Sequence, residues 1–189
     1  MAHVENTDQH LIDLCNGANA ARAVAAFDEL YRRHRQFVLR VALRYAGDHQ
    51  LALDAMQDTF MWLLGRFPPD GPGITLTAKL TTLLYPVARS KAVDARRRFD
   101  PPTSAEPLDT AVEQVAPEER AADLHEVLAR LPEERREVLV LRFVEDFSLQ
   151  DIAAALAIPL GTVKSRIHLA VKALRDDPVT RAFFDRNDP

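Results

Sequence analysis

The feature that most constrains this chain is a segment near its middle that cannot take part in a packed core. Residues 100–117 contain four prolines and four acidic residues, and they show no sustained hydrophobic periodicity. Such a stretch buries too little apolar surface to offset the entropy of ordering it, so it stays an extended, charged linker. The sequence therefore predicts two domains, at residues 1–99 and 118–177, followed by a tail at 178–189.

Both domains have the hydrophobic pattern of α-helices. Apolar residues recur every three or four positions, and no strand-like alternation is present. The predicted fold class is all-α: two small helical domains joined by a flexible acidic linker. The expected helices span residues 9–15, 20–46, 48–67 and 77–98 before the linker, and 117–130, a segment starting at 132, and a pair within 148–177 after it.

Three local features refine these helices. Residues 67–73 hold three prolines and two glycines, which interrupt both helix and strand, so a loop is expected there. Pro86 is expected to kink its helix or displace the helix start, because its ring removes a hydrogen bond to the preceding turn. The apolar stripes place Leu64 and Phe143 in the cores. Arg33 belongs to an arginine face that is most simply solvated, and an acidic partner for some of its members is the alternative.

The charge distribution is more informative than the net charge of −4. Residues 100–126 carry eight acids and one arginine, which accounts for the whole deficit. Residues 89–98 carry five cations against one acid, and residues 161–175 carry four cations and no acid. Two concentrated basic segments separated by an acidic one are typical of a protein that touches DNA at two places.

The second basic segment lies in a predicted helix-turn-helix at residues 148–177. Ser148 and Asp151 have the spacing of a capping box, and Pro159 suits only the first turn of a new helix. The second helix leaves a hydroxylated, basic face pointing outward, as a helix that reads the major groove needs. A helical hairpin with a solvated basic face is the alternative. The outward residues are Thr162, Lys164, Ser165, Arg166, His168 and Lys172.

The third predicted helix carries a polar, acidic face. Asp54, Gln57 and Asp58 are spaced three and four residues apart and are therefore neighbours on the helix surface. Such a face beside Trp62 suits docking onto a basic partner helix, and simple exposure to solvent is the alternative.

Composition argues against several other classes of protein. No apolar run is long enough to span a bilayer, no secretory signal is expected at the start, and a single cysteine, Cys15, fits the reducing cytoplasm. No phosphate-binding glycine loop or nucleophile–base pair is present, so neither an enzyme nor a cofactor is expected. A zinc site at His3, His10 and Cys15 is a weak alternative, because these residues lack metal-ligand spacing.

Several motifs together resemble a known family. LDAMQDTFMWLLGRF at 53–67, LLYPVARSKAVDARRR at 83–98 and the long segment at 128–174 that contains GTVKSR occur in the order and spacing of bacterial sigma factors. The resemblance is to the small, two-domain extracytoplasmic-function (ECF) group of the sigma-70 family, and it covers residues 26–98 and 118–175. It implies a non-enzymatic factor that binds core RNA polymerase, directs it to promoters and melts them.

The resemblance also assigns roles to residues. Region two would dock on the coiled coil of the largest polymerase subunit, and its loop at 67–79 would hold a base flipped from the non-template strand. The acidic linker would thread the RNA-exit region, and many such factors are held by a cognate anti-sigma factor. The implied polymerase contacts are Asp54, Gln57, Asp58, Thr59 and Phe60; the implied −10 contacts are Tyr85, Arg89, Ser90, Lys91, Arg96, Arg97 and Arg98; the outward residues of the helix-turn-helix would read the −35 element.

The chain departs from the family pattern at five positions. Leu83, Pro86 and Ser90 replace the usual Trp, Arg and Asn, and Leu169 and Val171 stand where basic residues are usual. Each lost phosphate contact lowers affinity for DNA, so weaker or altered −35 recognition is expected. A sigma-like adaptor that does not melt promoters and a LuxR-type regulator are the alternatives, although the latter would need a receiver or ligand-sensing domain.

Overall fold

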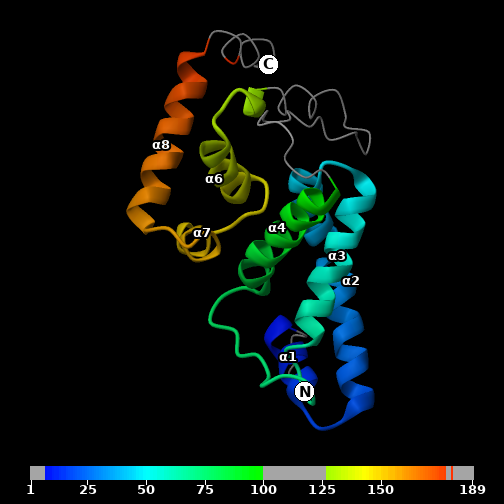
Figure 1. The fold of residues 1–189 in the computed structure, drawn as a ribbon. Helices are drawn as coiled ribbons and strands as arrows, with labels where there is room; N and C mark the ends of the chain where they lie inside the picture. Colours follow the sequence, from blue (N-terminus) through cyan, green and yellow to red (C-terminus); the bar gives the residue numbers. More distant parts are fainter. Residues whose placement is uncertain (1–6, 100–126, 178–179, 181–189) are drawn as a thin grey trace, which may run out of the picture. The chain divides into compact units, whose positions relative to one another are not determined.

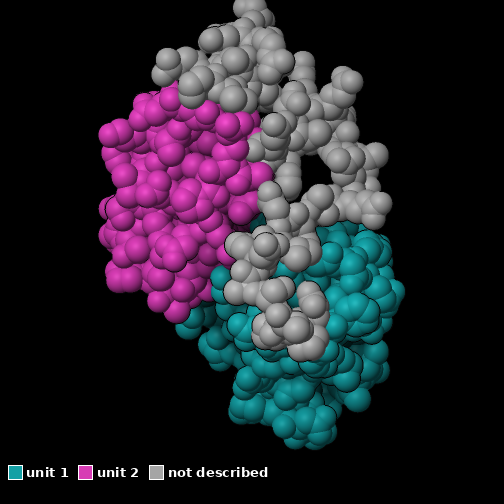
Figure 2. Space-filling view, turned by 45° about the horizontal axis from the view of Figure 1, so that its top comes forward, with its two compact units in different colours: residues 1–113 teal, residues 114–189 magenta. Residues whose placement is uncertain are grey.

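The computed structural model describes residues 7–99, 127–177 and 180. The predicted linker, most of the predicted helix at 117–130 and nearly all of the tail lie outside these residues. The chain divides into two compact units, Met1–Glu113 and Gln114–Pro189, coloured separately in Figure 2. Every regular element of the described residues is an α-helix, so the all-α prediction is confirmed. None of the described helices is both long and apolar enough to cross a membrane.

Unit 1 is built around one long helix (Figure 1). The second helix packs against the other three, and the third also packs against the fourth. The buried side chains that join them include Leu30, Val38, Leu63 and Leu84, all with no exposed surface. The helices are α1 (Asp8–Asn16), α2 (Ala20–Ala46), α3 (His49–Leu64) and α4 (Leu80–Phe99).

The helix starts follow from side-chain caps. Thr7, Asn19 and Asp48 each accept a hydrogen bond from a backbone N–H in the first turn of α1, α2 and α3. Each such cap contributes about 1 kcal/mol because it satisfies a donor that has no partner inside the helix. Gly47 separates α2 from α3 with φ +91°, a left-handed conformation that favours glycine.

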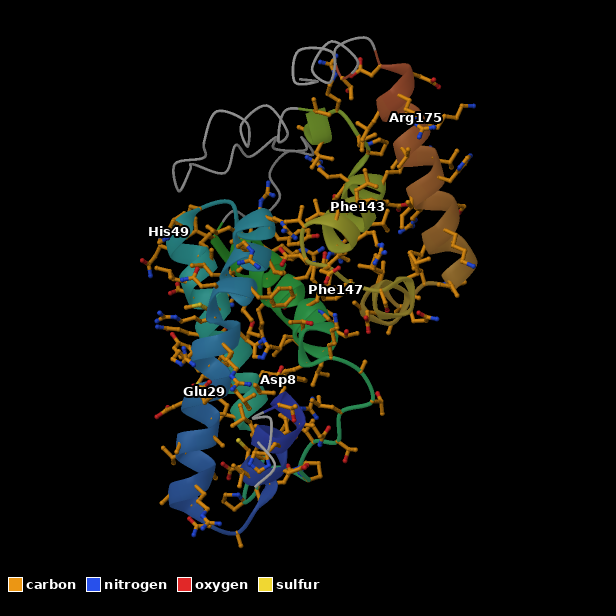
Figure 3. All side chains as sticks on the ribbon, turned by 180° about the vertical axis from the view of Figure 1, so that it is seen from behind. Asp8, Glu29, His49, Phe143, Phe147 and Arg175 are labelled. Atoms are coloured by element: carbon orange, nitrogen blue, oxygen red, sulfur yellow. The ribbon has the colours of Figure 1, made fainter. Side chains whose placement is uncertain are left out.

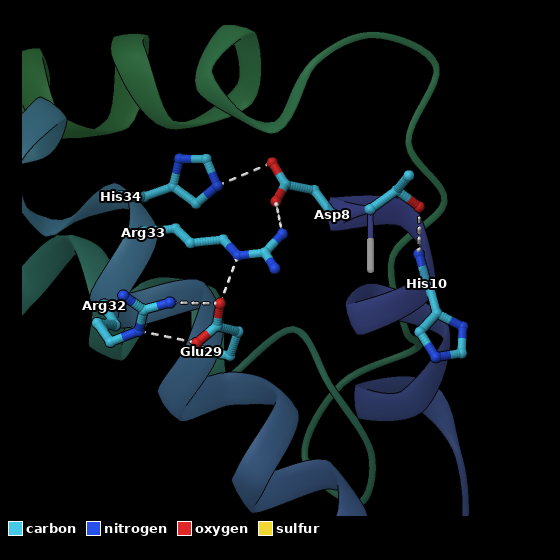
Figure 4. Close-up of polar contacts among 7 residues, drawn as sticks. Asp8, His10, Glu29, Arg32, Arg33 and His34 are labelled. Carbon is cyan, nitrogen blue, oxygen red and sulfur yellow. Dashed lines mark hydrogen bonds and ion pairs between the residues drawn. The ribbon is translucent and has the colours of Figure 1, made fainter. Parts of the chain in front are cut away.

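A polar network joins α1 to α2 (Figure 4). The Asp8 carboxylate contacts His34 Nε2 at 2.8 Å and Arg33 at 3.4 Å, and Arg33 also donates to Glu29 at 2.7 Å. The hydrogen bond from His34 lowers the pKa of Asp8, and hydrogen bonds from Arg32 and Arg33 lower that of Glu29 to about 2. The prediction of a fully solvated arginine face is therefore wrong for Arg33, whose side chain is only 28% exposed.

The two proline-containing segments behave differently. The loop after α3 is confirmed. The N–H groups of Arg66 and Phe67 each donate a hydrogen bond to the carbonyl three residues earlier, and Pro68 and Pro69 follow. These turns end α3 at Leu64, which is 45% exposed rather than buried as predicted, while Phe67 is buried against Phe27. By contrast, α4 begins at Leu80, three residues later than expected, and runs through Pro86 without a break.

Unit 2 contains three described helices of more than one turn, with the last packed against the other two. They are α6 (Glu133–Phe143), α7 (Leu149–Leu156) and α8 (Leu160–Asp176). The predicted capping box at Ser148 and Asp151 is confirmed. The turn between α7 and α8 places Ala157 at φ 52°, and Pro159 directly precedes α8.

The core of unit 2 differs from the prediction at one aromatic residue (Figure 3). Phe143 was expected inside, but it is the last residue of α6 and is 69% exposed. The chain then turns at Asp146, with φ 52°, and Phe147 enters the core at 1% exposure. Arg142 donates to the carbonyl of Phe147 at 2.9 Å and helps to fix this turn. Phe147, and not Phe143, is therefore the aromatic residue buried here.

Candidate protein and nucleic-acid interfaces

The acidic face predicted on α3 is present and lies on the surface of unit 1. Asp54 and Gln57 are exposed, and the Asp58 side chain is 47% exposed. They line an open groove of about 410 Å³ between α3 and the end of α4, which also includes Arg98 and Phe99. The ion pair between Arg98 and Asp58 is long, at 3.7 Å, and its side chains are well exposed, so it contributes little to stability. The groove therefore offers two carboxylates and an amide to a partner.

Thr59 and Phe60 do not lie on this exposed face, so in this structure they are not accessible as the polymerase contacts that the resemblance implies. Thr59 is fully buried and donates its hydroxyl hydrogen bond to the Ala55 carbonyl at 2.7 Å. Phe60 is 4% exposed and packs edge-on against Tyr31 of α2, with ring centroids 4.8 Å apart. Thr59 lies on the side of α3 opposite Gln57 and Met61, and Phe60 lies between these two sides, where it meets Tyr31. Their part is to hold α3 against the core.

Sequence reasoning missed an apolar continuation of the acidic face. Met61 is 65% exposed and Leu64 is 45% exposed. They follow Gln57 at the spacing that keeps side chains on one surface of a helix. The apolar stripe predicts Leu64 in the core, and this is wrong because Leu64 is exposed. The exposed surface of α3 is thus acidic near its middle and apolar near its end.

The basic residues of α4 divide into two groups. Arg89 and Arg96 are half-buried; the Arg89 guanidinium lies 5.1 Å from the Tyr45 ring, and the Arg96 stem lies beside Gly47. Ser90, Arg97 and Arg98 are exposed, and Lys91 is half-buried. Seven residues are nearly two helical turns, so Ser90 and Arg97 share one side of α4 and Lys91 and Arg98 share another.

Tyr85 cannot contact DNA from its position in this structure, which corrects a prediction. Its ring has no exposed surface, and its hydroxyl is 2.9 Å from the Tyr45 hydroxyl. Tyr45 in turn lies beneath the Arg89 guanidinium, where the ring face attracts the cation. The hydrogen bond between the two tyrosines therefore links α4 to α2, and the Tyr45 ring packs against the Arg89 guanidinium.

The outward face predicted on α8 is largely present. Val163 and Ala170 are buried, and Lys164, Ser165, His168 and Lys172 are exposed, while Thr162 is half-buried. Both hydroxyl-bearing residues lie near the start of the helix, and the Ser165 hydroxyl donates a hydrogen bond to the Thr162 carbonyl at 3.0 Å. Leu169 is 43% exposed beside them, and Val171 is half-buried.

Arg166 is the exception on α8. Its side chain is 23% exposed and its guanidinium pairs with the Glu134 carboxylate of α6 at 2.6 Å. The prediction that Arg166 points freely outward is therefore wrong. The helical period could not reveal this pairing, because Glu134 lies 32 positions away along the chain.

Two family models match this chain. Residues 30–100 match the family model for sigma-70 region 2, and residues 121–174 match that for sigma-70, region 4. The ECF RNA polymerase sigma factor SigL of Mycobacterium tuberculosis is 36% identical over 167 residues, which cover 85% of this chain and 92% of SigL. The chain belongs to the ECF group of the sigma-70 family. It is therefore a promoter-directing transcription initiation factor of RNA polymerase, as the sequence predicted.

Other similarities agree with this assignment. The RNA polymerase sigma-E factor of Streptomyces coelicolor is 34% identical to this sigma factor over 84% of the chain and 89% of that protein. Among solved structures, CnrH in complex with the cytosolic domain of CnrY has a TM-score of 0.58 at 23% identity, covering 96% of this chain and 99% of CnrH. RpoE of Bartonella quintana, in complex with the anti-sigma factor NepR, has a TM-score of 0.59 at 19% identity, covering 86% and 98%. These two structures show that the fold is shared.

Proposed function

We propose that this sigma factor uses three separate surfaces: the exposed side of α3 for core polymerase, the basic end of α4 for the −10 element, and α8 for the −35 element. The observation that carries the proposal is the segregation of charge. The carboxylates of Asp54 and Asp58 lie together on α3, whereas Arg97 and Arg98 lie together at the end of α4, and Lys164 and Lys172 lie on the outward side of α8.

The polymerase contact on α3 is a mixed acidic and apolar surface. Asp54, Gln57 and Asp58 would meet basic side chains of a partner helix, and Met61 and Leu64 would be covered by its apolar residues. A centre of apolar contacts with charged groups beside it is the usual composition of a specific protein interface. Thr59 and Phe60 act only indirectly, by fixing α3 in place.

The −10 contact is proposed for the end of α4 and for the loop at residues 67–79. Ser90, Lys91, Arg97 and Arg98 offer a hydroxyl and three cations to the phosphates of the non-template strand. Arg89 and Arg96 lie closer to α2 and add positive electrostatic potential at the phosphates. The loop holds the flipped base. Extraction of a base costs a few kcal/mol, which phosphate contacts and polymerase binding offset.

The −35 contact is proposed for the outward side of α8. Lys164, Ser165, His168 and Lys172 are the exposed groups that reach the major groove and its phosphates, with Thr162 at the helix start. Because Leu169 and Val171 supply no charge, the surface offers few cations, and recognition of the −35 element is expected to be weak. Binding of the polymerase then supplies the larger share of promoter affinity.

The experiment is run-off transcription with core polymerase on a library of genomic promoters. The wild-type chain is expected to start transcripts at defined sites, and failure on every template would overturn promoter melting and favour a sigma-like adaptor. Asp54→Asn with Asp58→Asn should weaken core binding, whereas Lys164→Ala with Lys172→Ala should weaken initiation only at −35-dependent promoters. Arg22→Ala, which removes an exposed cation outside all three surfaces, is the control. Equal loss of core binding in both double variants would refute the division of roles.

We propose further that the protein acts in the cytoplasm and is held by a cognate anti-sigma factor. The support is family membership and the solved complex of a protein of similar fold, RpoE, with the anti-sigma factor NepR. Affinity capture with the tagged chain from the source cells, followed by release of the captured protein on addition of core polymerase, tests this. A captured protein that does not compete with core polymerase would contradict the proposal.

A further inference from the structure

The end of α1 is hydrogen-bonded to the loop that follows α3. The side chain of Asn16, the last residue of α1, makes two hydrogen bonds with the backbone of Ile74. Its amide nitrogen donates to the Ile74 carbonyl at 2.7 Å, and its amide oxygen accepts from the Ile74 N–H at 2.9 Å. Both polar groups of one amide therefore engage a single residue 58 positions away along the chain.

The same place shows a close approach of backbone and side chain. Gly73 has φ +86°, and a Cβ built on it would lie 2.8 Å from Asn16 Oδ1. Only glycine fits there, because any side chain would meet both the strained conformation and the amide. The Gly73 N–H also donates to the Arg66 carbonyl at 2.9 Å, which ties the loop back to the turn after α3.

The loop is thus fixed at both ends, and its remaining part is exposed. Phe67 is buried at the start of the loop, and at its end the Thr82 N–H donates to the Lys79 carbonyl at 3.0 Å. Between the Asn16 contact and α4, Thr75 and the segment 77–79 are exposed to solvent. Figure 1 shows this loop passing beside α1 on its way to α4. The exposed part is therefore presented from a support that α1 provides.

α1 itself is firmly held to α2. Leu11, Ile12 and Cys15 are buried, and the Asp8 carboxylate contacts His34 and Arg33 on α2. The match to the sigma-70 region 2 model begins at residue 30, so α1 precedes the segment that defines the family.

We propose that α1 is the support of the base-reading loop and that Asn16 is a positioning residue for recognition of the flipped −10 base. The inference rests on the proposed function of the loop. When Asn16 is replaced, the loop leaves its docked conformation for part of the time. Apparent affinity for the correct base then falls in proportion to the docked fraction. Two hydrogen bonds of ordinary net strength correspond to a change on the order of tenfold.

The test measures binding of the full chain with core polymerase to single-stranded oligonucleotides of the non-template −10 sequence, with each base replaced in turn. Wild type should show a strong preference at one position. Asn16→Ala should reduce that preference about tenfold while affinity for core polymerase stays within about twofold. Asn16→Asp keeps the acceptor for the Ile74 N–H but sets a carboxylate oxygen against the Ile74 carbonyl, so it should lose at least as much preference as Asn16→Ala. Gln9→Ala, an exposed amide on the same helix, is the control.

Gly73→Ala probes the contact from the other side. It should reduce the preference at the same position. In combination with Asn16→Ala the total loss should be smaller than the sum of the two single losses, because the clash with the amide is then gone while the strain of the positive φ remains. Hydrogen exchange of the Ile74 amide should speed up in Asn16→Ala and not in Gln9→Ala.

The outcomes separate two failures. If wild type shows no base preference at any position, the proposed role of the loop is wrong and the inference falls with it. If wild type shows the preference and Asn16→Ala retains it in full, the inference alone is overturned. A uniform loss at all positions together with a loss of core affinity would show that Asn16 is merely structural, which also overturns it.

Discussion

The ion pair between Arg166 and Glu134 gives a quantitative prediction about −35 binding. Arg166 is the cation of α8 nearest the helix start after Lys164, yet it is engaged by Glu134 of α6 at 2.6 Å. If Arg166 also contacts the −35 element, as the family resemblance implies, DNA competes with this carboxylate for the guanidinium. Glu134→Gln removes the competing charge and keeps the size and shape of the side chain.

The magnitude follows from the exposure of the two side chains. Glu134 is 70% exposed and Arg166 is 23% exposed, so the pair is worth no more than the roughly 0.2–1 kcal/mol of a surface ion pair. Loss of the pair should lower the free energy of unfolding of unit 2 by that amount. In the wild type this ion pair must break before the guanidinium can bind DNA. Without this cost, affinity for a −35 duplex should rise by about 1.4- to 5-fold at low salt.

The assay is fluorescence anisotropy with a labelled −35 duplex and the full chain at several salt concentrations. Glu133→Gln removes the same charge one residue away and is the control for a general electrostatic gain. In an Arg166→Ala background, Glu134→Gln should have little further effect. If Glu134→Gln binds DNA no better than Glu133→Gln, Arg166 serves only to fix α8 against α6, and its assignment to the −35 contact is wrong.

Three further predictions concern the folds of the two units. Asp8→Asn should destabilise unit 1 near neutral pH by about 1 kcal/mol. Because the hydrogen bond from a histidine lowers the pKa of Asp8, this difference should persist above about pH 4 and vanish as the pH falls through the lowered pKa. Urea titrations at several pH values would show this dependence. Phe147→Ala should cost about 3–5 kcal/mol and Phe143→Ala less than about 0.5 kcal/mol in the same measurement, and equal costs would contradict the burial pattern. Tyr85→Phe, which removes the hydrogen bond to Tyr45, should cost about 1 kcal/mol in thermal unfolding and leave binding of single-stranded −10 DNA unchanged; a large loss of DNA binding at unchanged stability would restore Tyr85 as a contact.

Much of the fold was predictable because its determinants are local in the sequence. Caps at Asp48 and Ser148, the break at Pro159 and the period of apolar residues placed most described helices within a few residues of their observed bounds. The end of α3 was extended too far, because the turns after Leu64 continue the helical pattern of apolar residues without continuing the helix.

The candidate site was less predictable, since exposure is decided by packing between helices. Thr59, Phe60 and Tyr85 match a family motif, but motif position does not say which side of a helix faces α2. The pairing of Arg166 with Glu134 and that of Asn16 with Ile74 join residues far apart in sequence, and no local pattern announces them. The proposed interfaces themselves stay predictions until the variants are measured.

Cys15 provides an intrinsic reporter of the α1 support. It is the single cysteine of the chain, it is 3% exposed in the contact between α1 and α2, and burial raises its pKa to about 11. A buried, protonated thiol does not react with alkylating reagents, so modification requires α1 to leave α2 first. The rate of alkylation of the unmodified protein therefore measures how often α1 detaches, in the presence or absence of core polymerase and promoter strands, without any engineered label.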